Sequence, residues 1–161
     1  MLKRLRANGF KSLQGIDVEL PRLTVLFGPN AGGKSNLLDA VQAISRIGTS
    51  HTLSDALSEP IRGYPTEAFT LPSGGLSSLL GQSHSRFDLA ADLSVGKDLL
   101  RYNVQVEIQP QSGSLSVVDE CLSSLTAKGE LKRTPTIEKV NDQLRIRRKS
   151  TRRMSPGGAR S

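Results

Sequence analysis

The chain has 161 residues, of which 36% are hydrophobic and 23% charged, as in a soluble globular domain that buries its own core. No run of about 18 apolar residues is present, and the basic N-terminus lacks the apolar stretch of a secretory signal. The single cysteine, Cys121, excludes an internal disulfide, and two distant histidines, His51 and His84, argue against a structural zinc site. We therefore expect a cytoplasmic protein that does not contact a membrane.

The positive charge of the chain is concentrated near its C-terminal end. Lysine and arginine number 22 against 15 acidic residues, which gives a net charge of +7. Residues 145–161 contain seven basic residues and no acidic one, so the rest of the sequence is neutral overall. Because the excess belongs to one segment, the charge of the whole chain does not identify a nucleic-acid-binding domain.

Three short strands are predicted at the start of the chain. Residues 2–10 form the first, and a turn leads to the second, in which Ile16, Val18 and Leu20 alternate with acidic residues. Residues 23–27, LTVLF, form a compact apolar run that is typical of a strand buried on both faces.

A helix and then a long loop are predicted next. A glycine-rich turn at 28–33 leads into a helix that Gly48 caps, and residues 48–85 are rich in serine, glycine, proline and threonine, which favours a loop with one or two short helices. The apolar positions expected on one face of the helix are Leu37, Leu38, Val41, Ile44 and Ile47.

Strand patterns return after residue 86. Clean alternation over 87–95 and 100–108, with turns between, predicts an antiparallel meander whose third strand begins at Leu115. Weaker strands are expected near 136–140 and 143–148. The predicted organisation is a strand-helix lobe that contains the glycine-rich turn (1–48), a Ser/Gly/Pro-rich loop region (49–86), an antiparallel β-subdomain (87–148) and a basic disordered tail (149–161).

A motif with a defined chemistry lies between the apolar run and the predicted helix. Residues 28–35, GPNAGGKS, fit the G-x-x-x-x-G-K-[ST] pattern of the phosphate-binding loop. Glycines let the backbone curl so that N–H groups point at phosphate oxygens, and the helix start adds its positive dipole end. Lys34 is then expected to reach the β- and γ-phosphates, and the Ser35 hydroxyl to bind Mg²⁺. The alternative is a glycine-rich turn that only caps a helix.

The N-terminal part of the sequence resembles one lobe of a known class of ATPase heads. The Phe10-Lys11-Ser12 turn, followed by GPNAGGKSNLL at 28–38, is similar to the N-terminal lobe of SMC/RecF/OLD-type ATPases of the ABC class, with the AAA-family ATPases of the RecF-like branch the nearest in pattern. The resemblance covers roughly residues 1–122. It implies an α/β P-loop NTPase fold with an antiparallel β-subdomain, and ATP with Mg²⁺ as the bound cofactors.

The resemblance also implies roles for individual residues. Residues 30–35 would wrap the triphosphate, and Lys11 would lie near the nucleotide unless it is an ordinary surface lysine. Asp39 is expected to be a solvated or helix-pairing acid. The implied nucleotide-binding set is Gly28, Pro29, Asn30, Ala31, Gly32, Gly33, Lys34, Ser35 and Asn36, with Lys11 as a weaker member. Ser35 is the implied Mg²⁺ ligand, and Gln82 is a weak candidate for Mg²⁺ binding or for the Q-loop glutamine.

Other elements of ABC-type catalysis have only lookalikes in this sequence. Asp119 and Glu120 follow a broken apolar run and fit a strand end of the meander better than a Walker B motif. Residues 71–75, LPSGG, resemble the signature motif but lie in the Ser/Gly-rich loop, where a flexible loop is the simpler interpretation. Gln42 on the predicted helix is expected to be solvated.

The sequence therefore predicts an incomplete ABC-type head. We expect it to bind ATP and to turn it over only when a second lobe or head, from a homodimer or a split partner chain, supplies the signature motif and Walker B. A fragment, a split gene and a truncated frame all fit. The resemblance implies DNA-related work, such as repair, chromosome maintenance or phage defence.

Two alternative functions remain open at the sequence level. One is a degenerate, non-catalytic fragment that binds nucleotide or nucleic acid, and the other is a small P-loop metabolite kinase, which the antiparallel meander argues against. The six basic residues of Arg145–Arg153 would bind DNA phosphates, or would instead form a solvated strand edge and tail.

Overall fold

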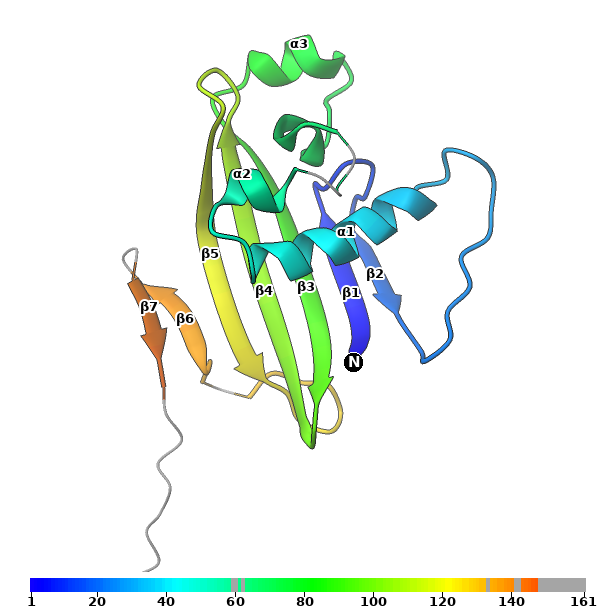
Figure 1. The fold of residues 1–161 in the computed structure, drawn as a ribbon, viewed down its shortest axis with the longest axis vertical. Coiled ribbons are helices and arrows are strands. Elements are labelled where there is room, and N and C mark those ends of the chain that lie inside the picture. Colours follow the sequence, from blue (N-terminus) through cyan, green and yellow to red (C-terminus); the bar gives the residue numbers. More distant parts are fainter. Residues whose placement is uncertain (59–60, 62, 133, 141–142, 148–161) are drawn as a thin grey trace, which may run out of the picture.

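One antiparallel sheet forms the framework of the molecule. The computed structural model describes residues 1–58, 61, 63–132, 134–140 and 143–147. Within these ranges the seven strands follow the order β2-β1-β3-β4-β5-β6-β7 (Figure 1). The strands are β1 (Leu2–Asn8), β2 (Ile16–Glu19), β3 (Ser85–Val95), β4 (Asp98–Gln109), β5 (Ser114–Ser124), β6 (Ile137–Val140) and β7 (Gln143–Ile146).

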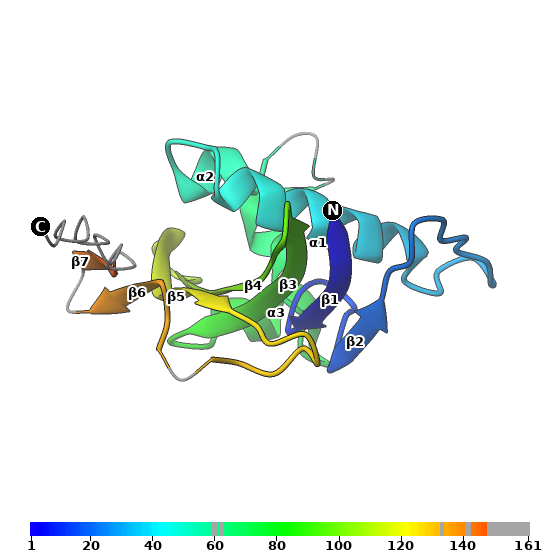
Figure 2. The same cartoon turned by 90° about the horizontal axis from the view of Figure 1, so that it is seen from below.

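The described helices lie over one face and one end of this sheet (Figure 1). They are α1 (Lys34–Ile47), α2 (Leu53–Ala56) and α3 (Gly75–Leu80), with a short 3₁₀ helix, η1 (Pro65–Ala68). Figure 2 shows α1 and α2 on the same side of the sheet, with the strands curving beneath them. The result is the predicted α/β fold with an antiparallel sheet. No helix in the described part of the chain is long and apolar enough to cross a membrane.

The long hairpins β3–β4 and β4–β5 confirm the predicted meander. Phe87 pairs with Val106 and Leu89 with Val104, so the apolar residues of neighbouring strands share one face. That face is buried, because these four side chains are at most 2% exposed. The weaker strands also form, as β6 and β7, and β6 joins the sheet by pairing with β5.

The N-terminal strands belong to the same sheet as the meander. β1 pairs with β2 on one side and with β3 on the other, both in antiparallel register. Leu5 and Ala7 of β1 therefore enter the core beside Leu89 and Ala91 of β3. β2, the last strand before the glycine-rich segment, is thus the edge strand of this sheet.

The buried face of α1 includes small residues that the apolar pattern did not indicate, and it excludes Leu38. Leu37, Ala40, Ala43 and Ile44 are buried, whereas Leu38 is 56% exposed. Leu38 instead lines a groove that it shares with Leu26 and Val41, between α1 and the segment that precedes it. The small side chains at 40 and 43 allow the helix to lie close to the sheet, and the prediction that Leu38 shares this face is wrong.

The prediction of a buried strand over residues 23–27 is also wrong for this structure. No strand is assigned there, and Leu23, Val25 and Phe27 are 83%, 72% and 90% exposed. A strand buried on both faces needs strands beside it and layers above and below it. Within the described residues β2 pairs only with β1, and the segment from β2 to α1 extends away from the sheet (Figure 1).

The region predicted as a long loop contains more structure than expected. It forms α2, η1 and α3, and it buries Leu57, Phe69 and Leu79 completely. Leu57 and Phe69 belong to the core that the sheet and α1 share. The tail predicted over 149–161 lies outside the described residues.

Candidate phosphate-binding site

The glycine-rich turn leads directly into the N-terminus of α1. Ala31 and Gly33 both have left-handed backbone angles, with φ of 64° and 78°, which curl the chain ahead of Lys34. Gly33 is the N-cap, no described side chain caps it, and the first helical turn holds no acidic residue. The first N–H groups of the helix are therefore left to a ligand or to water, at the positive end of the helix dipole.

These residues surround a polar hollow of about 310 Å³. It is lined by the backbone and side chains of residues 30–36. The Lys34 ammonium donates hydrogen bonds to the carbonyl oxygens of Gly28 at 3.0 Å and Pro29 at 2.6 Å, and so spans the loop. Ser35 is exposed, so its hydroxyl is accessible from solvent. The Lys34 cation, the exposed Ser35 hydroxyl and the uncapped N–H groups form the kind of donor set that binds a polyphosphate with Mg²⁺.

Asn36 and Lys11 have partners within the protein. The Asn36 amide donates to the Ser12 hydroxyl at 2.7 Å, so that group already has a role beside the loop. The Lys11 ammonium lies 2.6 Å from a carboxylate oxygen of Asp39. Asp39 is buried, which corrects the expectation of a solvated acid, and its neighbour in the sequence, Ala40, is fully buried as well. The predicted contacts of Asn36 and Lys11 with a nucleotide stay predictions.

The other sequence candidates lie away from the hollow. Asp119 and Glu120 are on β5, where the Tyr102 hydroxyl donates to Glu120 at 2.7 Å. Burial beside this carboxylate raises the pKa of the Tyr102 hydroxyl well above its ordinary value. Gln82 follows α3 and is exposed, and residues 71–75 lead into that helix. None of these is among the residues that line the hollow at 30–36.

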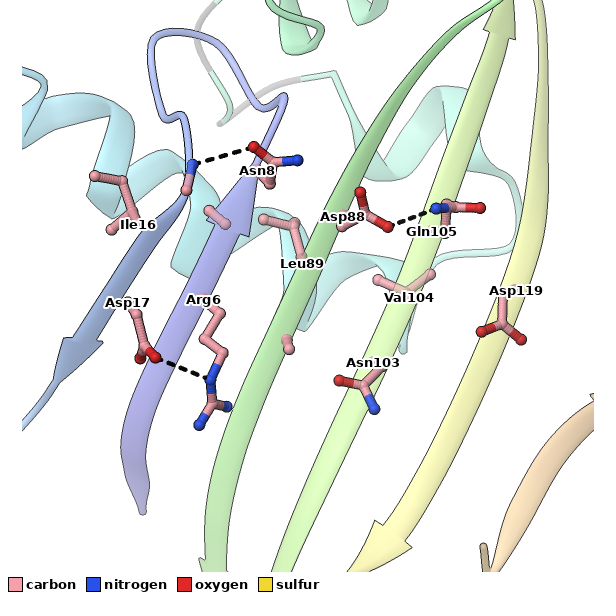
Figure 3. Close-up of a pocket in the computed structure, with 13 residues that line it drawn as sticks. Arg6, Asn8, Ile16, Asp17, Asp88, Leu89, Asn103, Val104, Gln105 and Asp119 are labelled. Atoms are coloured by element: carbon pink, nitrogen blue, oxygen red, sulfur yellow. Dashed lines mark hydrogen bonds and ion pairs between the residues drawn. The ribbon is translucent and has the colours of Figure 1, made fainter. Parts of the chain in front are cut away.

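A second hollow, which sequence reasoning missed, lies on the face of the sheet opposite α1. It has a volume of about 490 Å³ and is lined by residues 6–8 of β1, 88–90 of β3 and 103–105 of β4, with further residues from β2 and β5. Figure 3 shows Asp17, Asp88, Asn103, Gln105 and Asp119 pointing into this space, with α1 behind the strands. The polar residues that alternate with the apolar ones in these strands are the sequence signal for this hollow.

An ion-pair network borders this second hollow. Asp92 accepts hydrogen bonds from Arg101 at 2.6 and 3.0 Å and from Arg6 at 3.2 and 3.4 Å. Arg6 also lies 3.3 Å from Asp17, which Arg4 contacts at 2.5 Å. Burial raises the pKa of the Asp92 carboxyl, but the hydrogen bonds and charges of Arg101 and Arg6 outweigh burial and hold that pKa below its ordinary value of 3.8.

This network predicts an acid-sensitive fold. A carboxyl with a lower pKa in the folded chain contributes stability above its unfolded pKa and loses that contribution as the pH falls through its folded pKa. The free energy of unfolding should therefore fall as the pH drops below about 4. Urea denaturation between pH 3 and 7 measures it. Asp92→Asn should reduce the dependence of the free energy of unfolding on pH, whereas Asp98→Asn, at an exposed residue, should not. The same pH dependence in Asp92→Asn and the wild type would show that the Asp92 carboxyl is not the acid-sensitive group.

The described part of the basic segment forms ion pairs at the sheet edge. Arg145 lies 3.6 Å and Arg147 3.2 Å from the same carboxylate oxygen of Glu138 on β6. These two arginines thus have an acidic neighbour, and residues 148–153 lie outside the described residues. The structure therefore tests the DNA-binding prediction for Arg145–Arg153 only at its first residues, where an ion pair competes with phosphate.

The glycine-rich turn, the lysine that spans it and the uncapped helix have the arrangement typical of the P-loop nucleoside triphosphatase fold. The family described as "AAA domain, putative AbiEii toxin, Type IV TA system" matches residues 23–152, which is most of the chain. The chain belongs to this family.

Two further comparisons place the chain among similar proteins. An OLD nuclease of Thermus scotoductus (strain ATCC 700910 / SA-01) is 43% identical over 44 residues, which are 27% of this chain and 8% of that protein. The chain thus spans only a small part of that relative. A solved structure from work on ATP-driven dimerization and DNA-stimulated activation of SMC ATPases aligns with a TM-score of 0.43 and 15% identity, over 81% of this chain and 71% of that one.

Proposed function

We propose that this chain is the ATP-binding module of an ATPase of the AAA family. One observation carries the proposal: the uncapped N-terminus of α1 opens into a polar hollow that Lys34 and the backbone of 30–36 line. Family membership supports the same conclusion. Residues 28–35 would act as the Walker A loop, in which the backbone N–H groups bind the β-phosphate and Lys34 bridges the β- and γ-phosphates.

Magnesium fits the same donor set. The exposed Ser35 hydroxyl at the start of α1 is the oxygen ligand that we propose for Mg²⁺. When bound, the ion would neutralise charge on the phosphate oxygens. Gln82 stays a weaker candidate for this site, since it follows α3 and does not line the hollow.

Hydrolysis, in this proposal, needs groups from a second lobe or head. The support is the exposed apolar segment of 23–27, which with Leu38 leaves large aliphatic and aromatic side chains in solvent. Two shallow grooves, of about 380 and 280 Å³, separate this segment from α1 and β2 and are lined mainly by apolar residues. Surfaces of this kind mark interaction sites, and a strand from the partner beside 23–27 would bury it.

We further propose that the complete ATPase is cytoplasmic and does DNA-related work. The segment Arg145–Arg153 carries six basic residues, and phosphate binding by such a segment would depend strongly on salt. One similar protein is named as a nuclease, which agrees with DNA-related work.

Calorimetric titration of the chain with ATP and Mg²⁺ tests the proposal. We expect saturable binding, with adenosine binding much more weakly, because the phosphates supply most of the contacts. Hydrolysis by the chain alone should stay far below the usual enzyme range of about 1–10³ s⁻¹. Absence of binding to a folded chain would refute the ATP-binding module, and rapid turnover by the chain alone would refute the need for a second lobe.

A further inference from the structure

The turn between β1 and β2 is held in an uncommon backbone conformation. Lys11 has a φ of 49°, in the left-handed region that residues other than glycine seldom adopt. Two hydrogen bonds fix its peptide groups: its N–H donates to the Ala68 carbonyl at 2.9 Å, and its carbonyl accepts from the Thr70 hydroxyl at 2.7 Å. Neighbouring Phe10 is fully buried. The surroundings thus impose this conformation on Lys11, as is common at functional positions.

This conformation directs two polar side chains at α1. The Lys11 ammonium meets the Asp39 carboxylate at 2.6 Å, with both side chains nearly buried at 11% and 6% exposed. The Ser12 hydroxyl accepts from the Asn36 amide at 2.7 Å. Asn36 and Asp39 are three residues apart and therefore lie on the same side of the helix, one turn above the other.

The β1–β2 turn also packs against Gly33, the N-cap of α1. A methyl group added to Gly33 would lie 3.4 Å from the Ser12 hydroxyl oxygen, so the turn packs directly against the N-cap. The same turn is bonded to 68–70, where the Thr70 N–H donates to the Gly9 carbonyl at 2.8 Å. The position of the first N–H groups of α1 is therefore set by the β1–β2 turn.

We propose that Lys11 and Ser12 are positioning residues for phosphate binding, and that Lys11 acts through Asp39 and not as a ligand of the nucleotide. This inference rests on the proposed ATP site. Moving the Lys11 ammonium to a phosphate would break its 2.6 Å contact with a carboxylate that is only 6% exposed, which is unfavourable. The ion pair therefore holds α1 against the sheet, so that the N–H groups meet the phosphates in a fixed place.

The test compares Lys11→Met, Asp39→Asn, the double variant and Ser12→Ala, with Lys97→Met in the exposed β3–β4 turn as control. Two quantities are measured: affinity for MgATP and MgADP, and hydrogen–deuterium exchange of the amides of 33–37 without nucleotide. We expect Lys11→Met and Asp39→Asn each to weaken both nucleotides by about tenfold. The double variant should be weakened by less than the two single effects combined, because both single variants break the same Lys11–Asp39 contact.

The exchange measurement does not depend on nucleotide binding. Faster exchange at 33–37 in Lys11→Met and Asp39→Asn, but not in Lys97→Met, supports the proposal even if the wild type fails to bind ATP, a result that would refute only the proposed function. Ser12→Ala removes one partly exposed hydrogen bond and should fold, with affinity reduced about fivefold. Unchanged exchange in all three single variants, or affinity lost in Lys11→Met but kept or increased in Asp39→Asn, overturns the inference.

Discussion

Replacing Lys34 by alanine is expected to weaken MgATP binding by about a hundredfold or more. In the proposed site the Lys34 ammonium would make charge-assisted hydrogen bonds to two phosphates, each contributing roughly 1.5–3 kcal/mol. Two such bonds correspond to about two or more factors of ten in the dissociation constant. Part of that gain is offset in the wild type, because Lys34 must first give up its bonds to the carbonyls of Gly28 and Pro29.

The same substitution should leave the fold almost unchanged. The two carbonyls belong to exposed residues that water reaches, so the free energy of unfolding should change by no more than about 0.5 kcal/mol. Calorimetric titration and thermal denaturation of the same sample separate the two effects. Lys97→Ala serves as the control for the loss of one positive charge. An Lys34→Ala variant that binds MgATP like the wild type would show that the nucleotide, if it binds, binds elsewhere.

Local sequence patterns were enough to predict the meander and the glycine-rich turn that leads into α1. Alternation over 87–95 and 100–108 depends only on which face of a strand is buried, so β3 and β4 follow from the sequence alone. The loop motif likewise needs only its own glycines, Lys34 and the start of α1. Features of this kind involve residues close together in the chain, and both are present in the structure.

The features that sequence reasoning missed depend on distant partners. The Lys11–Asp39 ion pair joins residues 28 positions apart, and no spacing rule connects a turn to a helix in this way. The apolar run at 23–27 is typical of a strand buried on both faces, but such burial depends on neighbouring strands that the run itself does not identify. A strand at 23–27 could form only with other strands beside it. Within the described residues, no strand of the sheet pairs with this segment.

The same substitution at two phenylalanines should distinguish a core position from an interaction surface. Phe87 is fully buried and meets the rings of Phe10 and Phe69 at centroid distances of 5.2 and 5.0 Å. Phe87→Ala should lower the free energy of unfolding by about 3–5 kcal/mol, because it removes a large buried surface and leaves a cavity. Phe27 is 90% exposed, and Phe27→Ala should change that free energy by less than about 0.5 kcal/mol.

Urea denaturation of the two variants beside the wild type measures this contrast, and binding of a fluorescent apolar dye such as anilinonaphthalene sulfonate measures the exposed surface. Phe27→Ala should reduce dye binding to the folded chain, whereas Phe87→Ala should increase it through partial loss of packing. A cost for Phe27→Ala near that for Phe87→Ala would mean that 23–27 is already packed in solution, and the partner strand proposed for it would have no surface to bury. If Phe27→Ala leaves the free energy of unfolding almost unchanged, Phe27 does not stabilise the fold of this chain. It directly precedes the proposed phosphate-binding loop, where a second lobe would gain most by covering it.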